Sequence, residues 1–215
     1  MEIDIKAEYL RLAYIFRAKD TPEKPEYAPL VGVRVEPHKD GAIIVATDGA
    51  CMFIGIDETG YADQAVNLTD DLDKAITYMD DKRRVLVDAN SLRVTLKGTT
   101  LITVADPILE DQGYPDWRRV IPTAKPQFPL FPASFAGKYL AAIGRLRSYD
   151  PRFDDIIFYG NGSKEPAVLR FTAMPSIMVL LMPCVPKNWS PTAQLDRKWL
   201  EQFTLAAPEG GSSDL

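Results

Sequence analysis

Residues 30–56 read LVGVRVEPHKDGAIIVATDGACMFIGI, and their pattern decides the fold class. Runs rich in β-branched residues are separated by polar turn signals, which is typical of a meander of antiparallel strands. We predict strands over residues 30–35, 42–46 and 51–56, joined by turns at Asp40-Gly41 and Asp48-Gly49. This meander forms the β part of a first structural unit.

A helix precedes the meander, and the same order of elements recurs twice along the chain. Apolar residues at the i, i+3, i+4, i+7 spacing begin at Tyr9 and predict a helix over residues 6–19. The same spacing begins again at Leu72, after Thr69 as a candidate N-cap and an acidic first turn. A third helix is predicted over residues 133–146. The strands predicted after the second and third helices are 84–87, 91–96, 100–105, 156–159, 167–172 and 177–182.

The recurrence predicts an α+β fold built from repeated units. Each unit has the order strand, helix, strand, strand, strand, and about three units of roughly 60 residues fit the chain. Residues 188–215 differ in composition, and we expect a short helix over 194–203 followed by a disordered end.

Composition restricts the classes of function. The 215 residues are 46% hydrophobic and carry a formal net charge of −5, from 25 Lys and Arg and 30 Asp and Glu. A chain this apolar can bury a core, so wholesale disorder is excluded. The acidic balance argues against a protein that coats nucleic acid indiscriminately, but net charge does not say where the basic side chains lie.

Few residues are suited to catalysis, metal binding or redox chemistry. His38 is the single histidine, in a polar stretch that predicts a solvated turn, and Cys51 and Cys184 are the two cysteines. A zinc site or a disulfide framework needs more such residues. The acidic cluster of Asp70, Asp71 and Asp73 is explained by a helix N-terminus without a metal. We therefore expect a protein that is not an enzyme and that uses no cofactor or metal.

The sequence also indicates where the protein acts. No apolar run approaches the ~20 residues that a membrane helix needs. The first residues, MEIDIKAEYL, lack the basic and then apolar pattern of a signal peptide. We expect a cytoplasmic protein with no membrane partner.

Three strings, in the right order, resemble the bacterial DNA polymerase III β subunit, the sliding clamp. Residues 45–49, VATDG, resemble the family's VATDG, and residues 180–183, LLMP, resemble its C-terminal VVMP. The most specific string is residues 114–122, YPDWRRVIP, which resembles FPDYRRVLP. The chain departs from the family at Ala50-Cys51-Met52, where clamps have His-Arg-Leu, and at residues 184–186, which replace Met-Arg-Leu.

The resemblance implies a shortened and divergent clamp of about one and a half domains. Residues 1–122 would form a clamp-like domain of two units, and residues 123–187 a half-domain of one unit. Residues 188–215 would be a C-terminal extension, partly disordered. Because a half-domain leaves a sheet edge without its partner half, we expect a homo-oligomer in which residues 125–187 pair with the same region of another chain.

The resemblance further implies contact with double-stranded DNA. Clamp helices carry Lys and Arg toward the phosphate backbone without reading bases. The implied DNA-facing residues are Lys6, Arg11, Arg17, Lys138, Arg145 and Arg147. The alternative is that these side chains only solvate the helix faces.

A hydrophobic pocket for partner peptides is the second implied site. Clamps capture peptides of the Gln-Leu-x-Leu-Phe type from polymerases and other proteins, and a clamp loader is a further implied partner. The implied lining is Leu30, Thr47, Gly49, Ala50, Cys51, Met52, Pro115, Val120, Leu180, Met182 and Pro183. The alternative is that these residues are ordinary core.

Two functions follow from this resemblance. One is a clamp-like replication processivity factor or scaffold that encircles or contacts DNA. The other is a non-ring adaptor derived from a clamp, which binds proteins and never encircles DNA.

Overall fold

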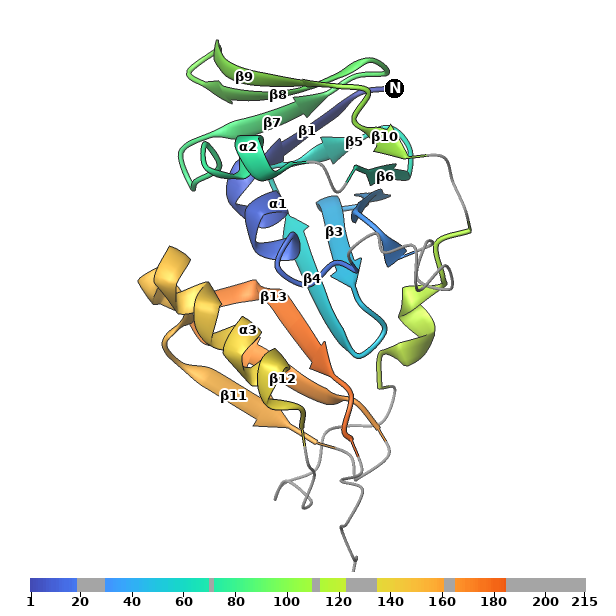
Figure 1. Ribbon diagram of the computed structural model, residues 1–215, viewed down its shortest axis with the longest axis vertical. Coiled ribbons are helices and arrows are strands. Elements are labelled where there is room, and N and C mark those ends of the chain that lie inside the picture. Colours follow the sequence, from blue (N-terminus) through green and yellow to red (C-terminus); the bar gives the residue numbers. More distant parts are fainter. Residues whose placement is uncertain (19–29, 70–71, 110–112, 123–134, 161–164, 185–215) are drawn as a thin grey trace, which may run out of the picture. The chain divides into compact units, whose positions relative to one another are not determined.

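Two antiparallel sheets and three α-helices make up the part of the chain that the computed structural model describes, which is residues 1–18, 30–69, 72–109, 113–122, 135–160 and 165–184 (Figure 1). These residues belong to one compact unit, Met1–Cys184. The predicted helix over 194–203 and the predicted disordered end lie outside the described residues.

The smaller sheet has five strands and joins the start of the chain to its middle. Its order is β5 (Tyr61–Ala62), β1 (Ile3–Lys6), β7 (Arg84–Val87), β8 (Ser91–Leu96) and β9 (Thr99–Ala105). In β1 and β7 buried residues alternate with partly exposed ones, so one face of the sheet packs on the core. The first strand of the chain therefore lies in the sheet of the second unit.

The larger sheet has eight strands and carries the candidate site. Its order is β10 (Ile108–Leu109), β6 (Val66–Leu68), β2 (Val33–His38), β3 (Gly41–Thr47), β4 (Cys51–Asp57), β13 (Met174–Leu181), β12 (Ala167–Phe171) and β11 (Ile156–Tyr159). Strand β4 pairs with β13, from Cys51 opposite Leu181 to Gly55 opposite Ile177. This pairing makes the first and third units one continuous sheet.

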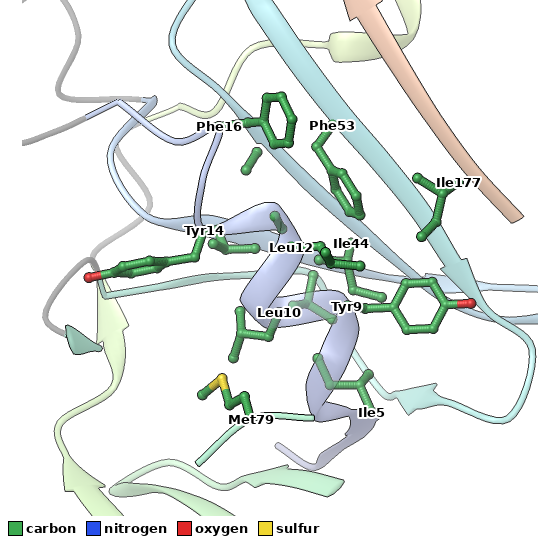
Figure 2. Packing of buried hydrophobic residues seen from close by; sticks show 14 of the residues in the cluster. Ile5, Tyr9, Leu10, Leu12, Tyr14, Phe16, Ile44, Phe53, Met79 and Ile177 are labelled. Carbon is green, nitrogen blue, oxygen red and sulfur yellow. The ribbon is translucent and has the colours of Figure 1, made fainter. Parts of the chain in front are cut away.

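The core lies against helix α1 (Ala7–Ala13), which packs on β1, β3 and β4. Figure 2 shows Phe16 just beyond α1 beside Phe53 of β4, and the two rings stack with centroids 5.8 Å apart. Fully burying a side chain such as Phe53 contributes about 1.5–3 kcal/mol. Helix α3 (Gly137–Tyr149) buries Ala142, Ile143 and Leu146 in the same cluster.

Two short helices connect these elements. The 3-10 helix η2 (Trp117–Val120) follows strand β10 along the chain, and η3 (Pro151–Phe153) follows α3. In each, an Asp at the N-cap accepts a hydrogen bond from the backbone N–H two residues later, Asp116 from Arg118 and Asp150 from Arg152. No helix among these described residues combines the length and hydropathy needed to cross a membrane.

The predicted helices differ most from the structure. Helix α1 is shorter than the predicted 6–19, because Ile3–Lys6 pairs with β7 as a strand and the helix ends at Ala13. Helix α2 covers only Asp73–Ile76, although Leu72, Ala75 and Met79 of the predicted stripe are buried. Asp70 and Asp71 of the predicted acidic turn lie outside the described residues. The other predicted helix is shifted, from 133–146 to Gly137–Tyr149.

The predicted strands are confirmed with small shifts. Strands β7, β8 and β11 have the predicted bounds, β4, β9 and β12 differ by one residue at one end, and β3 extends one residue further at both ends. Strand β2 lies three residues later than predicted, and β13 begins three residues earlier and ends one residue earlier. His38 is the last residue of β2, paired opposite Gly41, so the prediction that it lies in a turn is wrong. The turn is shorter and holds Lys39 and Asp40.

Candidate functional site

A cavity of about 160 Å³ opens beside the ends of β4 and β13, where η2 packs against the larger sheet. Three segments far apart in the sequence contribute most of its lining: the connection from β3 into β4, the stretch around η2, and the end of β13. Leu30 and Pro166 complete it. The lining residues are Leu30, Thr47, Gly49, Ala50, Cys51, Met52, Pro115, Asp116, Trp117, Val120, Pro166, Leu180 and Met182.

The pairing of β4 with β13 fixes one side of the cavity. Met52 lies opposite Leu180 in the ladder, and the Met182 backbone N–H donates to the Ala50 carbonyl at 2.9 Å. Leu180 is buried, whereas Met182 is partly exposed at the cavity's rim. This side of the cavity therefore presents the apolar side chains of one continuous sheet.

The turn between β3 and β4 is held by its own side chains. Oδ1 of Asp48 accepts hydrogen bonds from the backbone N–H groups of Ala50 and Cys51, each at 3.1 Å. The Thr47 hydroxyl accepts from the Gly49 N–H and donates to the Cys51 carbonyl. Gly49 has φ +88°, a conformation that glycine adopts without steric cost. The sequence Thr-Asp-Gly thus places Ala50 and Cys51 at the cavity.

Glu36 of β2 anchors the opposite side of the cavity. Its carboxylate accepts from the Arg118 guanidinium at 2.7 Å, from Arg34 at 3.1 Å and from the Trp117 indole N–H at 3.4 Å. Burial raises the pKa of Glu36, but the hydrogen bonds from Arg118 and Arg34 outweigh burial and hold that pKa below its ordinary value. The buried Trp117 is therefore fixed against the sheet with its ring in the lining.

The chemistry of the lining favours binding over catalysis. Apart from Thr47, Asp116 and the Cys51 thiol, the lining side chains are apolar or absent. Burial, together with the charge of Asp48, raises the pKa of Cys51 to about 12, so its thiol is protonated near neutral pH. No group of three or more His, Cys, Asp and Glu side chains suited to a metal ion occurs among the residues that the structure describes.

The structure brings the predicted pocket residues together around this one cavity, with the exception of Pro183. Pro183 lies next to the lining residue Met182 but does not itself contribute. Sequence reasoning missed Asp116, Trp117 and Pro166. Asp116 and Trp117 belong to the string 114–122, which also contains the predicted pocket residues Pro115 and Val120. Their position between these two residues was the signal that could have identified them. Pro166 precedes β12 and carries no such signal.

The six predicted DNA-facing residues lie in different surroundings. On α3, Lys138, Arg145 and Arg147 are all exposed; Lys138 forms an ion pair with Asp48, and Arg147 forms one with Asp154. Lys6 ends strand β1 and is the N-cap residue of helix α1.

The two arginines near α1 are engaged within the chain. Arg11 donates to the Met79 carbonyl at 2.9 Å, and its guanidinium lies 4.1 Å from the centre of the Tyr149 ring. Arg17 lies beyond the end of α1, donates to the Tyr14 carbonyl and stacks on the Tyr14 ring. Both side chains are only partly exposed.

Comparisons with known proteins place the fold. The sequence matches no protein-family model and no curated protein. Solved structures do match: the DNA polymerase sliding clamp of Pseudomonas aeruginosa has a TM-score of 0.61 at 14% identity, over 86% of this chain and 66% of that one. The sliding clamp of Bacillus subtilis has a TM-score of 0.58 at 14% identity, over 86% of this chain and 64% of that one.

A third match extends the pattern. DNA polymerase III subunit beta of Borrelia burgdorferi, solved in complex with a natural product, has a TM-score of 0.55 at 14% identity, over 86% of this chain. The present chain spans 63% of that protein's length, and thus less than two thirds of each of these three clamps. The described part of the chain has the fold of the bacterial sliding clamps.

Proposed function

We propose that this protein is a shortened, divergent sliding clamp that serves DNA replication as a processivity factor or scaffold. It contacts or encircles duplex DNA without sequence specificity and tethers partner proteins through the cavity beside β4 and β13. The observation that carries the proposal is this cavity, in which apolar side chains from three distant segments converge on a clamp fold. The proposed protein is cytoplasmic, not an enzyme, and works as a homo-oligomer.

The ligand that suits the cavity is a short peptide with apolar side chains. At about 160 Å³ the cavity is smaller than the ~300–1,000 Å³ pockets that enclose small molecules. It suits the anchoring side chains of a peptide whose backbone stays at the surface. Each Å² of apolar surface removed from water stabilises such a complex by about 25 cal/mol. A DNA polymerase or another protein with a Gln-Leu-x-Leu-Phe segment is the proposed partner, and a clamp loader is a further one.

Helix α3 is the proposed DNA contact. Lys138 and Arg145 are exposed on it, and phosphate contacts need only positive charge rather than base recognition. With so few cations, affinity should be low and should fall steeply with salt.

A non-ring adaptor is the second candidate, and two observations favour it. The chain spans less than two thirds of the clamps that it resembles. Four of the predicted cations already have partners within the chain: Arg11, Arg17, Arg147 and Lys138. In the adaptor, the cavity binds peptides and helix α3 does not contact DNA.

Peptide binding by the cavity is common to the clamp and the adaptor, and a binding experiment tests it. Calorimetry with the peptide QLSLF should show binding by the wild type and weaker binding by Met182→Ala, because this change removes an apolar contact from the cavity's rim. Leu101→Ala is the matched control, since Leu101 and Met182 are both 37% exposed but Leu101 lies on β9, outside the lining. If the wild type does not bind the peptide, the proposed peptide-binding function is refuted for both candidates, and only the similarity of fold to the sliding clamps remains.

Retention on circular DNA separates the two candidates. A clamp should remain bound to a closed circle of DNA and dissociate when the circle is cut. The double change Lys138→Glu and Arg145→Glu should reduce the time for which the protein is retained on the closed circle. Sedimentation should then show an oligomer, both with and without DNA. A protein that binds the peptide but sediments as a monomer and is not retained would be the adaptor.

A further inference from the structure

Asp48 joins the lining of the cavity to the first turn of α3. Its Oδ1 atom holds the backbone N–H groups of Ala50 and Cys51, both of which line the cavity. Its Oδ2 atom lies 3.9 Å from the Nζ atom of Lys138. One carboxylate therefore contacts both proposed sites.

The position of Lys138 explains why this carboxylate matters to the helix. Helix α3 begins after Ala136 with no side-chain cap, and the positive end of a helix disfavours a lysine in its first turn. The negative charge of Asp48 offsets the unfavourable position of this lysine. The Lys138 ammonium also lies 4.4 Å from the centre of the Tyr139 ring.

Lys138 is nevertheless held loosely. Its side chain is 70% exposed, and exposed ion pairs contribute little to stability. A DNA phosphate that approaches α3 can therefore replace Asp48 as the partner of this ammonium. When it does, the carboxylate that positions Ala50 and Cys51 loses its cation.

We propose that Lys138 exchanges between Asp48 and a DNA phosphate, so that DNA on α3 and a peptide in the cavity weaken each other's binding. This inference rests on the proposed function, because it requires both ligands. A peptide packed against Ala50 and Cys51 favours the arrangement in which Asp48 keeps its lysine, and DNA favours the other. A coupling of this kind is reciprocal, since each ligand shifts the same two-state element.

The coupling gives the protein a specific property. A partner bound in the cavity lowers the affinity of the protein for DNA, which favours movement along the duplex while the partner is tethered. Because the exchanged pair is exposed, the expected effect is a roughly two- to fivefold change in either affinity.

The experiment measures the dissociation constant of fluorescently labelled QLSLF with and without a saturating random-sequence duplex. For the wild type, DNA should weaken peptide binding roughly two- to fivefold. Lys138→Ala should abolish this effect. Asp48→Asn should also abolish it, because asparagine keeps an acceptor for the Ala50 and Cys51 amides but carries no charge. Arg145→Ala is the matched control, since Arg145 lies on the same helix and forms no ion pair with the described residues; it should lower DNA affinity yet keep the coupling.

The outcomes separate this inference from the proposed function. If the wild type binds both ligands and the coupling is absent, or is equal in all four proteins, the exchange of Lys138 is refuted and the proposed function stands. If the wild type binds no peptide or no DNA, the proposed clamp function fails and this inference fails with it. A coupling lost in Lys138→Ala and Asp48→Asn but kept in Arg145→Ala supports the exchange.

Discussion

The Arg152 guanidinium of η3 donates a hydrogen bond of 2.9 Å to the carboxylate of Glu8 in α1, across 144 positions of sequence. The Glu8 side chain is only 12% exposed, and its burial raises its pKa although Arg152 acts in the opposite direction. Arg152 is held in turn by Asp150, the N-cap of η3. This pair therefore ties the first unit to the third.

Replacing Arg152 should destabilise the protein, because it leaves a buried carboxylate without its charged partner. We expect Arg152→Ala to lower the free energy of unfolding by about 1–3 kcal/mol, measured by urea denaturation. Arg147→Ala is the matched control. Its pair with Asp154 is exposed, and its loss should cost less than ~1 kcal/mol. Equal effects of the two changes would contradict a structural role for the Glu8 pair.

The Glu36 carboxylate should make stability depend on pH. Hydrogen bonds from Arg118 and Arg34 outweigh burial and lower its pKa in the folded protein. A carboxylate with a lowered folded pKa stabilises the fold above its unfolded pKa, and this contribution is lost as the pH falls through the folded pKa. Glu36→Gln should therefore cost about 1–3 kcal/mol at neutral pH, and the gap to the wild type should close in acid.

Urea denaturation of both proteins at several pH values checks this prediction. Glu165→Gln, a change at an exposed carboxylate with no ion pair to the described residues, should leave the unfolding free energy nearly unchanged at neutral pH. A gap between Glu36→Gln and the wild type that widens in acid would show that the sign is wrong.

Local sequence predicted the strands because hydrophobic burial in a strand repeats every two residues. Strand β7 and the first four residues of β8 carry this pattern, whereas β11 does not alternate and was recognised by its Ile, Phe and Tyr residues, which favour strands; the predicted bounds of all three are confirmed. Strands β5, β6 and β10 have two or three residues, too few for any period to be visible. Helix α1 was predicted too long mainly at its C-terminal end: it ends at Ala13, and Ala18 bridges to Val31, a tertiary contact that helical spacing does not reveal.

The cavity was predictable only in part. Its apolar lining follows from strings that resemble a known family, and the structure brings nearly all of those residues together. The contacts that hold the lining in place join residues far apart in sequence. Glu36 and Trp117 are 81 positions apart, and no spacing rule connects them. The pairing of Asp48 with Lys138 was invisible for the same reason.

The two cysteines should differ sharply in reactivity. Burial raises the pKa of Cys51 to about 12, so almost none of its thiol is ionised near pH 8, whereas Cys184 is exposed. Iodoacetamide should therefore modify Cys184 in the folded protein, and Cys51 only after unfolding, as checked by peptide mass spectrometry. The variant Cys184→Ser should take up no label while folded. Rapid labelling of Cys51 in that variant would mean that the cavity opens readily.

The homo-oligomer should form through strand β11. It is the last strand of the larger sheet in the described part of the chain, and none of its residues, Ile156–Tyr159, is charged. Uncharged edge strands invite pairing with another chain, and an antiparallel pair of identical strands has twofold symmetry. A lysine on this edge should prevent pairing, so Ile157→Lys should shift sedimentation toward the monomer. Leu101→Lys is the matched control, because Leu101 has the same 37% exposure on the end strand β9 of the other sheet. Dissociation by Leu101→Lys instead would place the interface on β9, and a wild type that is a monomer at tens of micromolar would contradict self-association.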